Sequence, residues 1–181
     1  PELVFEMHTR IGINTGKAIV GNMGSRTRFN YTMMGDTVNL AARCESGAKS
    51  YGIYTMVTEE TKEAAQKIND TLAFRFIDKI IVKGRSKPVG VYEIVDTKED
   101  LPRTELQCIQ MYERGFDRYL NQQWDEAITC FEESAGLERF QPGRDPGVKV
   151  NPSLVFIERC RIMKETPPPQ NWDGVFKMTS K

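Results

Sequence analysis

The sequence predicts an α+β domain followed by a small α-helical extension. Residues 9–95 alternate between short stretches with the two-residue period of a strand and stretches with the period of a helix. Residues 105–164 show helical spacing only, in separate stretches, and a polar segment that contains a proline divides the two parts. With 181 residues, of which 39% are hydrophobic, the chain is long enough to bury a core.

Three strands are predicted at the start of the domain. Residues 9–14 alternate apolar and polar side chains, which indicates a half-buried strand. A second strand begins at residues 18–20 and runs into glycines, and residues 29–34 alternate again as a third strand. Asp36 follows and is expected to cap the next helix, because its carboxylate can accept hydrogen bonds from the first free backbone N–H groups.

The next helix, predicted over residues 37–48, carries the first pair of residues with chemical potential. Asn39 and Arg43 are four residues apart, so their side chains lie on the same face. Arg binds phosphate oxygens as a fork, and Asn can hold a sugar hydroxyl. The same pair is also ordinary on a solvated helix face, so the spacing alone leaves both interpretations open. The packing side is expected to consist of small apolar residues: Val38, Ala41 and Ala42.

The rest of the domain is predicted to add one strand, one helix and a strand pair. A short strand covers residues 53–57, and Thr58 is expected to cap the helix that follows it. Residues 74–82 and 89–95 are predicted to form two paired strands, joined through residues 83–86.

The extension is predicted to begin after a linker at residues 98–104. Two helices follow, broken at residues 121–123, and a third helix covers residues 153–164. Residues 165–181 are expected to be an extended, proline-rich tail with Trp172 against a neighbouring surface. Small and aromatic positions typical of a tetratricopeptide-like hairpin are occupied by Gly115, Trp124, Ala127 and Phe131. One side of the third helix is predicted to carry Leu154, Ile157 and Cys160.

Composition excludes several classes of function. Lys and Arg together equal Asp and Glu at 25 each, so no basic field is available for nucleic acid or for anionic lipid. Apolar runs are too short for a membrane span, so no membrane contact is expected from this segment. A single histidine, His8, excludes a multi-histidine metal site. The four scattered cysteines indicate reduced thiols and a cytoplasmic location.

Three sequence segments together resemble the C-terminal half of a class III nucleotidyl cyclase catalytic domain. They are RIGINTGKAIVGNMGS, FNYTMMGDTVNLAARCES and IDKIIVKGRSKPVGVYEI, in this order and with natural spacing over residues 9–95. The resemblance implies a partial, ferredoxin-like cyclase fold for residues 1–97. The helical tail is similar to extensions that follow some microbial cyclase domains.

The resemblance implies roles for four residues at the phosphates and the ribose. Asn39 and Arg43 match the pair that steadies the ribose and the transition-state phosphate. Lys83 matches the lysine that contacts the triphosphate, and Arg10 matches a basic strand position that can also reach it.

The resemblance also implies a purine pocket. Thr32 matches the purine-selecting position, where a threonine is typical of bacterial-type adenylyl cyclases, so ATP is favoured over GTP. Met34 is expected to lie near this pocket. The implied reaction converts ATP to 3′,5′-cyclic AMP and pyrophosphate with two divalent cations, Mg²⁺ or Mn²⁺. Its site would form at the interface of a homodimer or of paired cyclase domains.

The chain departs from the family pattern at the metal site. The aspartate motif F-x-D-I-x-x-F-T and its following hairpin are missing, and Asp36 matches a helix-capping position. We therefore expect this chain to be a fragment of a longer parent protein. The fragment should bind no cations and be inactive alone. A region upstream of it could anchor the parent protein in a membrane. The alternatives are a guanylate cyclase and a degenerate cyclase-like domain for dimerisation or regulation.

Overall fold

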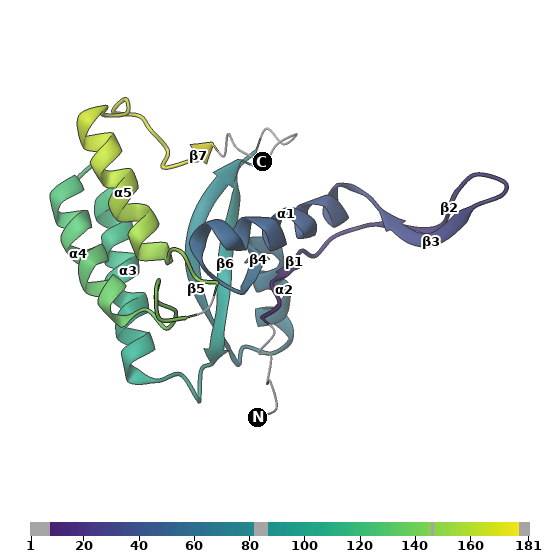
Figure 1. Cartoon of the computed structure of the whole chain (residues 1–181), viewed down its shortest axis with the longest axis horizontal. Coiled ribbons are helices and arrows are strands. Elements are labelled where there is room, and N and C mark those ends of the chain that lie inside the picture. The colour runs from purple at the N-terminus through teal and green to yellow at the C-terminus, as the bar shows by residue number, and fades with distance from the viewer. Residues whose placement is uncertain (1–7, 82–86, 146, 178–181) are drawn as a thin grey trace.

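The computed structural model describes residues 8–81, 87–145 and 147–177 of the chain. A central sheet separates a helical extension on one side from a long hairpin on the other (Figure 1). The elements, in chain order, are β1 Ile11–Ile13, β2 Ile19–Gly24, β3 Phe29–Met34, α1 Asp36–Tyr51, β4 Thr55–Thr58, α2 Glu59–Ile68, β5 Leu72–Ile81, β6 Val89–Thr97, α3 Arg103–Leu120, α4 Trp124–Leu137, α5 Pro152–Glu165 and β7 Phe176–Lys177. This arrangement is the mixed α+β fold that the sequence predicted.

The central sheet has the strand order β1-β4-β6-β5-β7. The predicted strand pair is confirmed, because β5 and β6 run antiparallel with Ile80 opposite Val89. Strand β1 lies parallel to β4 at one edge. At the other edge β7 pairs in parallel with β5, so the tail that was expected to be merely extended returns to the sheet.

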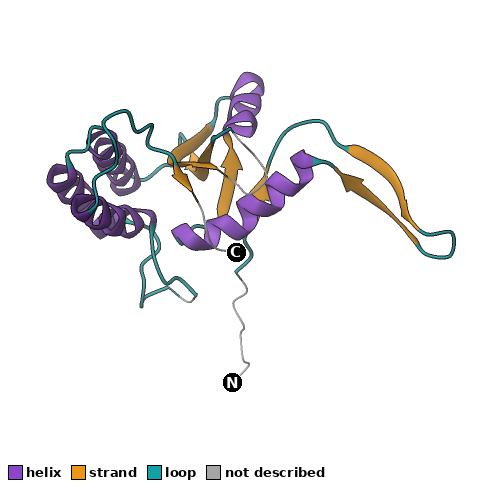
Figure 2. Cartoon of the chain, turned by 90° about the horizontal axis from the view of Figure 1, so that it is seen from above, coloured by secondary structure: helices purple, strands orange, loops and turns teal. Residues whose placement is uncertain are grey.

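The other two predicted strands form a hairpin that projects away from the body of the molecule (Figure 2). Strands β2 and β3 pair antiparallel along their whole length, from Ile19 opposite Met34 to Gly24 opposite Phe29. Neither face of this hairpin is covered, and Ile19 and Tyr31 are 70% and 74% exposed. The alternation in this part of the sequence therefore marks strands without marking a buried face.

Helix α1 begins at Asp36, and the prediction that Asp36 caps it was wrong. Gly35 is the cap residue, and no side chain makes a capping hydrogen bond at this end of the helix. The φ of Gly35 is 147°, a conformation that residues with a side chain rarely adopt. The chain turns into the helix at Gly35, so α1 begins at Asp36, one residue before the predicted start. Asp36 therefore lies in the first turn, where the helix dipole favours a carboxylate.

The predicted packing side of α1 was also wrong. Val38 and Ala41 are half-buried and Ala42 is exposed. The helix buries a different side, whose residues recur every three or four positions and include the large side chains of Leu40 and Tyr51. The buried residues of α1 are Leu40, Cys44, Gly47, Ala48 and Tyr51. Thr58, by contrast, caps α2 as predicted, and its side chain accepts a hydrogen bond from the backbone N–H of Thr61.

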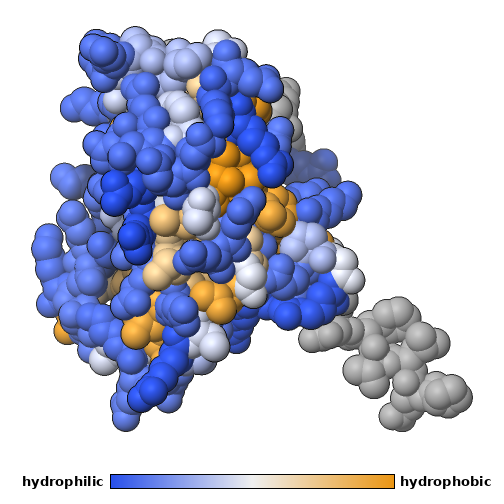
Figure 3. All heavy atoms as spheres, turned by 90° about the vertical axis from the view of Figure 1, so that its left-hand side faces the viewer, coloured by the Kyte–Doolittle hydropathy of each residue, from blue (hydrophilic) through white to orange (hydrophobic). Residues whose placement is uncertain are grey.

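The helical extension shares one core with the sheet. Phe131 of α4 and Phe156 of α5 pack on Tyr112 of α3, and the Tyr112 hydroxyl donates to the backbone carbonyl of Ile77 in β5. All four side chains are fully buried. Figure 3 views the molecule from the side of the extension, where apolar side chains gather in a strip within a mainly hydrophilic surface. The boundary at 98–104 and the tetratricopeptide-like character of the extension stay predictions.

The packing of the third helix and the tail was predicted in part. Ile157 and Cys160 of α5 are buried as expected, but Leu154 is 38% exposed and faces away from the core. Phe156 and Arg159 take the inward positions instead, because α5 is turned toward β5 and α1. Trp172 lies 5.0 Å from the ring of Tyr119, which confirms that the tail packs on a neighbouring surface.

Candidate functional site

The junction between the hairpin and α1 brings together four of the residues that the sequence singled out. Thr32 and Met34 lie on β3, and the chain passes through Gly35 into the helix that carries Asn39 and Arg43. Thr32, Met34 and Asn39 are exposed, and Arg43 is half-buried. The hairpin extends beyond this end of α1 (Figure 2).

The orientation of Asn39 and Arg43 follows from the buried face of α1. Leu40 and Cys44, their immediate neighbours in the chain, point into the core at 2% and 1% exposure. Because successive helical residues are rotated by about 100°, Asn39 and Arg43 point to the side of the helix, along one line. An amide and a guanidinium in this arrangement suit a sugar hydroxyl and a phosphate oxygen.

Asn14 fixes the first turn of α1 to the sheet. Its side-chain amide donates to the backbone carbonyl of Thr37 at 3.0 Å, and its carbonyl oxygen accepts from the Thr58 hydroxyl at 2.7 Å. One side chain thus links β1, α1 and β4. Sequence reasoning missed this role, and its only signal was that Asn14 ends the polar face of a predicted strand.

Gly12 allows the backbone of β1 to lie directly against α1. A Cβ at Gly12 would stand 2.2 Å from the carbonyl oxygen of Ala41 and from the backbone nitrogen of Glu45. Only a residue without a side chain fits there, on the turns of α1 that flank Arg43. The site is therefore held by backbone contact as well as by hydrogen bonds.

Of the two remaining predicted residues, only Arg10 is described, and it lies apart from this group. Arg10 lies with its guanidinium carbon 5.4 Å from the ring centroid of Tyr54, and its buried Nε has no hydrogen-bond partner among the described residues. The next residue, Ile11, donates its backbone N–H to the carbonyl oxygen of Tyr54, just after α1 ends, so Arg10 lies toward the far end of α1. Lys83 lies outside the described residues. The substrate roles of both residues stay predictions.

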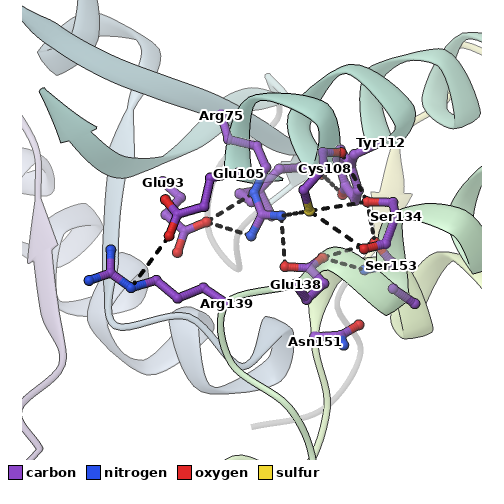
Figure 4. A network of polar contacts seen from close by, with 12 residues as sticks. Arg75, Glu93, Glu105, Cys108, Tyr112, Ser134, Glu138, Arg139, Asn151 and Ser153 are labelled. Atoms are coloured by element: carbon purple, nitrogen blue, oxygen red, sulfur yellow. Dashed lines mark hydrogen bonds and ion pairs between the residues drawn. The ribbon is translucent and has the colours of Figure 1, made fainter. Parts of the chain in front are cut away.

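A second polar cluster, which the sequence did not suggest, lies between the sheet and the extension (Figure 4). Arg75 of β5 donates to Glu93 of β6 at 2.6 Å and to Glu138, after α4, at 2.8 Å. Glu138 also accepts from the Ser153 hydroxyl at 2.9 Å. The Arg75 side chain is only 6% exposed. These contacts neutralise a buried guanidinium, and the cluster joins parts of the structure rather than presenting reactive groups.

The electrostatics of this cluster follow from its burial. Loss of solvent raises the pKa of Glu93, and the adjacent Arg75 opposes that rise. A cavity of about 360 Å³ adjoins the cluster, with Tyr54, Glu105 and Phe140 among its lining residues. Glu105 and Arg139 both line this cavity, with Oε1 of Glu105 3.7 Å from Nε of Arg139.

The described residues offer no metal site, and burial suppresses the reactivity of three thiols. No group of three or more His, Cys, Asp or Glu side chains in that part of the chain could hold a metal ion. All four cysteines are free. Burial raises the pKa of Cys44 and Cys108 to about 11 and that of Cys160 to about 12, so these thiols stay protonated near neutral pH. Among the described helices, none is long and apolar enough to cross a membrane.

Comparison with known sequences gives matches over the same segment. A family model described as the adenylate and guanylate cyclase catalytic domain matches residues 4–95. The terminal-differentiation specific adenylate cyclase of Dictyostelium discoideum is 34% identical over 155 residues, which are 85% of this chain and 7% of that protein. Adenylate cyclase 1 of Rhizobium meliloti is 42% identical over 100 residues, 55% of this chain and 15% of that protein. The chain thus spans a small part of these relatives.

The Dictyostelium match also reaches into the helical extension. Only 102 residues precede α3, so an alignment that covers 155 residues includes much of the part beyond. Among solved structures, the crystal structure of an adenylyl cyclase from P. aeruginosa is 38% identical with a TM-score of 0.42, over 51% of this chain and 45% of that one.

Proposed function

The chain belongs to the family of adenylate and guanylate cyclase catalytic domains, and we propose that it forms the transition-state half of an adenylate cyclase site. The observation that carries this proposal is the pair Asn39 and Arg43, set on one side of α1 directly after the exposed strand with Thr32. The reaction is intramolecular. The 3′-hydroxyl of ATP attacks the α-phosphorus, the bond to the β-phosphate oxygen breaks, and cyclic AMP and pyrophosphate result.

Asn39 and Arg43 act on the reacting part of the nucleotide. Asn39 hydrogen-bonds the ribose and holds the 3′-hydroxyl in line with the α-phosphorus. Arg43 stabilises the negative charge that develops on the α-phosphoryl oxygens. Both roles need a fixed helix, and Asn14 and Gly12 supply the contacts that fix α1.

In this proposal the hairpin and two basic side chains complete the contacts with the nucleotide. The Thr32 hydroxyl hydrogen-bonds the purine edge and favours adenine, with Met34 against the ring. Lys83 and Arg10 contact the triphosphate. Thr32 and Met34 are exposed on β3, which leaves them accessible to a nucleotide.

The two divalent cations of the complete enzyme do not fit the residues described here. That part of the chain offers no group of His, Cys, Asp or Glu side chains that could hold a metal ion. We assign cation binding to another part of the enzyme, and we expect the 181-residue chain to be inactive by itself.

A paired cyclase domain supplies the missing part of the site in this proposal. The hairpin supports a dimer, because a two-stranded sheet exposed on both faces is marginally stable in water. Its exposed apolar side chains form a surface of the kind that marks protein–protein contacts. They are Ile19, Val20, Phe29, Tyr31, Met33 and Met34. ATP as the substrate and four free thiols agree with a cytoplasmic location.

Substrate choice is tested on the longest protein that the gene encodes, purified and assayed with Mn²⁺ and either ATP or GTP. We expect cyclic AMP as the main product, and exchange of Thr32 for Cys should weaken the preference for ATP. A preference for GTP would make the protein a guanylate cyclase. Absence of product from both nucleotides would favour a degenerate, regulatory domain.

A further inference from the structure

The far end of α1 is held by the helical extension. Helix α1 ends at Tyr51, whose side chain is fully buried against α5. The Tyr51 hydroxyl donates to Oδ2 of Asp78 at 2.5 Å and accepts from Nη2 of Arg159 at 3.0 Å. Nη1 of Arg159 reaches the same Asp78 oxygen at 2.6 Å. These three residues join α1, β5 and α5 at one point.

This three-residue contact is built from buried groups. Asp78 is completely buried, and the Arg159 side chain is 9% exposed. Burial raises the pKa of Tyr51 well above its ordinary value, so the hydroxyl stays protonated and remains a donor. The Arg159 guanidinium also lies 4.7 Å from the ring centroid of Phe156 on its own helix. Each group is therefore oriented by more than one neighbour.

Backbone contact adds to the side-chain contact at the end of α1. Gly52 caps the helix with a φ of 69°, in the left-handed region. A Cβ at Gly52 would stand 1.7 Å from the carbonyl oxygen of Val150, in the segment that leads into α5. The extension thus touches α1 directly.

Helix α1 is consequently fixed at three places. Asn14 holds its first turn through Thr37, Gly12 of β1 lies against its middle, and the extension contacts its last residues, Tyr51 and Gly52. The contacts at its two ends together set its direction, so the helix can tilt when the contact with the extension is lost. Side-chain tips lie about 6 Å from a helix axis, so a tilt of about 10° moves such a tip by about 1 Å.

We propose that Arg159 is a positioning residue, which acts through Tyr51 and Asp78 to set the direction of the helix that carries Asn39 and Arg43. This inference rests on the proposed cyclase function for its catalytic consequence. The extension then also supports α1, the helix that carries the transition-state residues. The sequence similarity to the Dictyostelium adenylate cyclase also continues into the extension.

The catalytic test compares two tyrosine variants in the longest protein that the gene encodes. Tyr51→Phe removes the hydroxyl that links α1 to Arg159 and keeps the ring. Tyr112→Phe removes an equally buried hydroxyl, which joins the extension to the β5 backbone instead. We expect kcat for cyclic AMP formation to fall about tenfold or more in Tyr51→Phe, since a displacement of about 1 Å can cost up to about a hundredfold. KM for ATP should change less than about twofold, and Tyr112→Phe should keep the wild-type kcat.

Arg159→Lys should reproduce the Tyr51→Phe pattern, because an ammonium cannot reach both partners as a planar fork does. The proposal is overturned if both tyrosine variants lower kcat equally, or if Tyr51→Phe leaves kcat unchanged.

Amide hydrogen exchange separates this inference from the proposed function. In the 181-residue chain, Tyr51→Phe should accelerate exchange within α1, and Tyr112→Phe should leave α1 at the wild-type rate. If the wild-type long protein makes no cyclic nucleotide, the proposed function fails and the exchange result alone decides the structural link. Unchanged exchange in α1 of Tyr51→Phe overturns the inference whatever the activity.

Discussion

Individual buried charges carry much of the link between the sheet and the extension. Arg75 and Arg159 each meet a carboxylate of the sheet, and Arg75 also meets Glu138 of the extension. Removing one partner of such a pair is far more harmful than replacing the whole pair by apolar groups, because it leaves an uncompensated buried charge. These residues were not recognisable in the sequence. Arg75 stands between two phenylalanines in a strand, where alternation predicts an exposed side chain.

Arg75→Met should destabilise the chain by about 3 kcal/mol or more near neutral pH. Burial raises the pKa of Glu93, and removing Arg75 removes the charge that opposes that rise. For a carboxyl whose pKa is higher in the folded than in the unfolded state, the free energy of unfolding of the protein falls as pH rises through the folded-state pKa. The loss should therefore be smaller at about pH 5 than at pH 7. Urea unfolding of both proteins at the two pH values measures it. An equal loss at both would contradict the assignment of Glu93 as the affected group.

At the scale of elements, close backbone contact decides how α1 lies on the sheet. Gly12 faces backbone atoms of α1, whereas Gly136, near the end of α4, has no atom within 4 Å of its would-be Cβ. The two glycines thus stand in opposite environments, although the sequence does not distinguish them.

Gly12→Ala should lower the free energy of unfolding by about 3 kcal/mol or more, since backbone cannot move aside as a side chain can. Gly136→Ala serves as the matched control and should be neutral or stabilising by up to about 1 kcal/mol. Thermal or urea unfolding compares them. If Gly12→Ala is as stable as the wild type, β1 does not lie against α1 as described.

The elements that the sequence predicted are those with strong local patterns. Alternation located β3 and the β5–β6 pair, and Thr58 marked the start of α2. Strand β7 was missed because its partner in β5 is almost a hundred residues away, and a two-residue strand has no period of its own. The buried face of α1 was misjudged because alanines occur on both sides of the helix, whereas the large Leu40 and Tyr51 lie on the side that is buried.

The candidate site was predictable in a different way. Asn39 and Arg43 were found by spacing and by resemblance, and the structure places them together after β3. What fixes them was hidden, because Asn14, Gly12 and Arg159 act across distant parts of the chain. Contacts of this kind leave no local signal.

At the scale of the whole molecule, the described residues form a core shared by the sheet and the extension, with the β2–β3 hairpin projecting from it. The sheet and the extension bury their aromatic side chains together, whereas the β2–β3 hairpin is exposed on both faces. A dimer through the hairpin would cover that surface and place Thr32 near a partner.

Phe29→Ser combined with Tyr31→Ser should convert a dimer to a monomer, because the two side chains are neighbours on one face of the hairpin and are 63% and 74% exposed. Ile162→Ser on α5, 55% exposed and outside the hairpin, is the control and should leave the association unchanged. Sedimentation velocity of the three proteins decides this. A wild type that is monomeric at every concentration would argue against the hairpin interface.

The most direct measurement of the central claim is a complementation assay between two inactive proteins. One is the longest protein that the gene encodes with Arg43→Ala, and the other is the wild-type 181-residue chain. If the first supplies the metal ligands and the second supplies Thr32, Asn39 and Arg43, mixing them with Mn²⁺ and ATP should produce cyclic AMP, in an amount that rises as the chain is added. No cyclic AMP from a mixture in which the two proteins are shown to associate would contradict a shared site at the dimer interface.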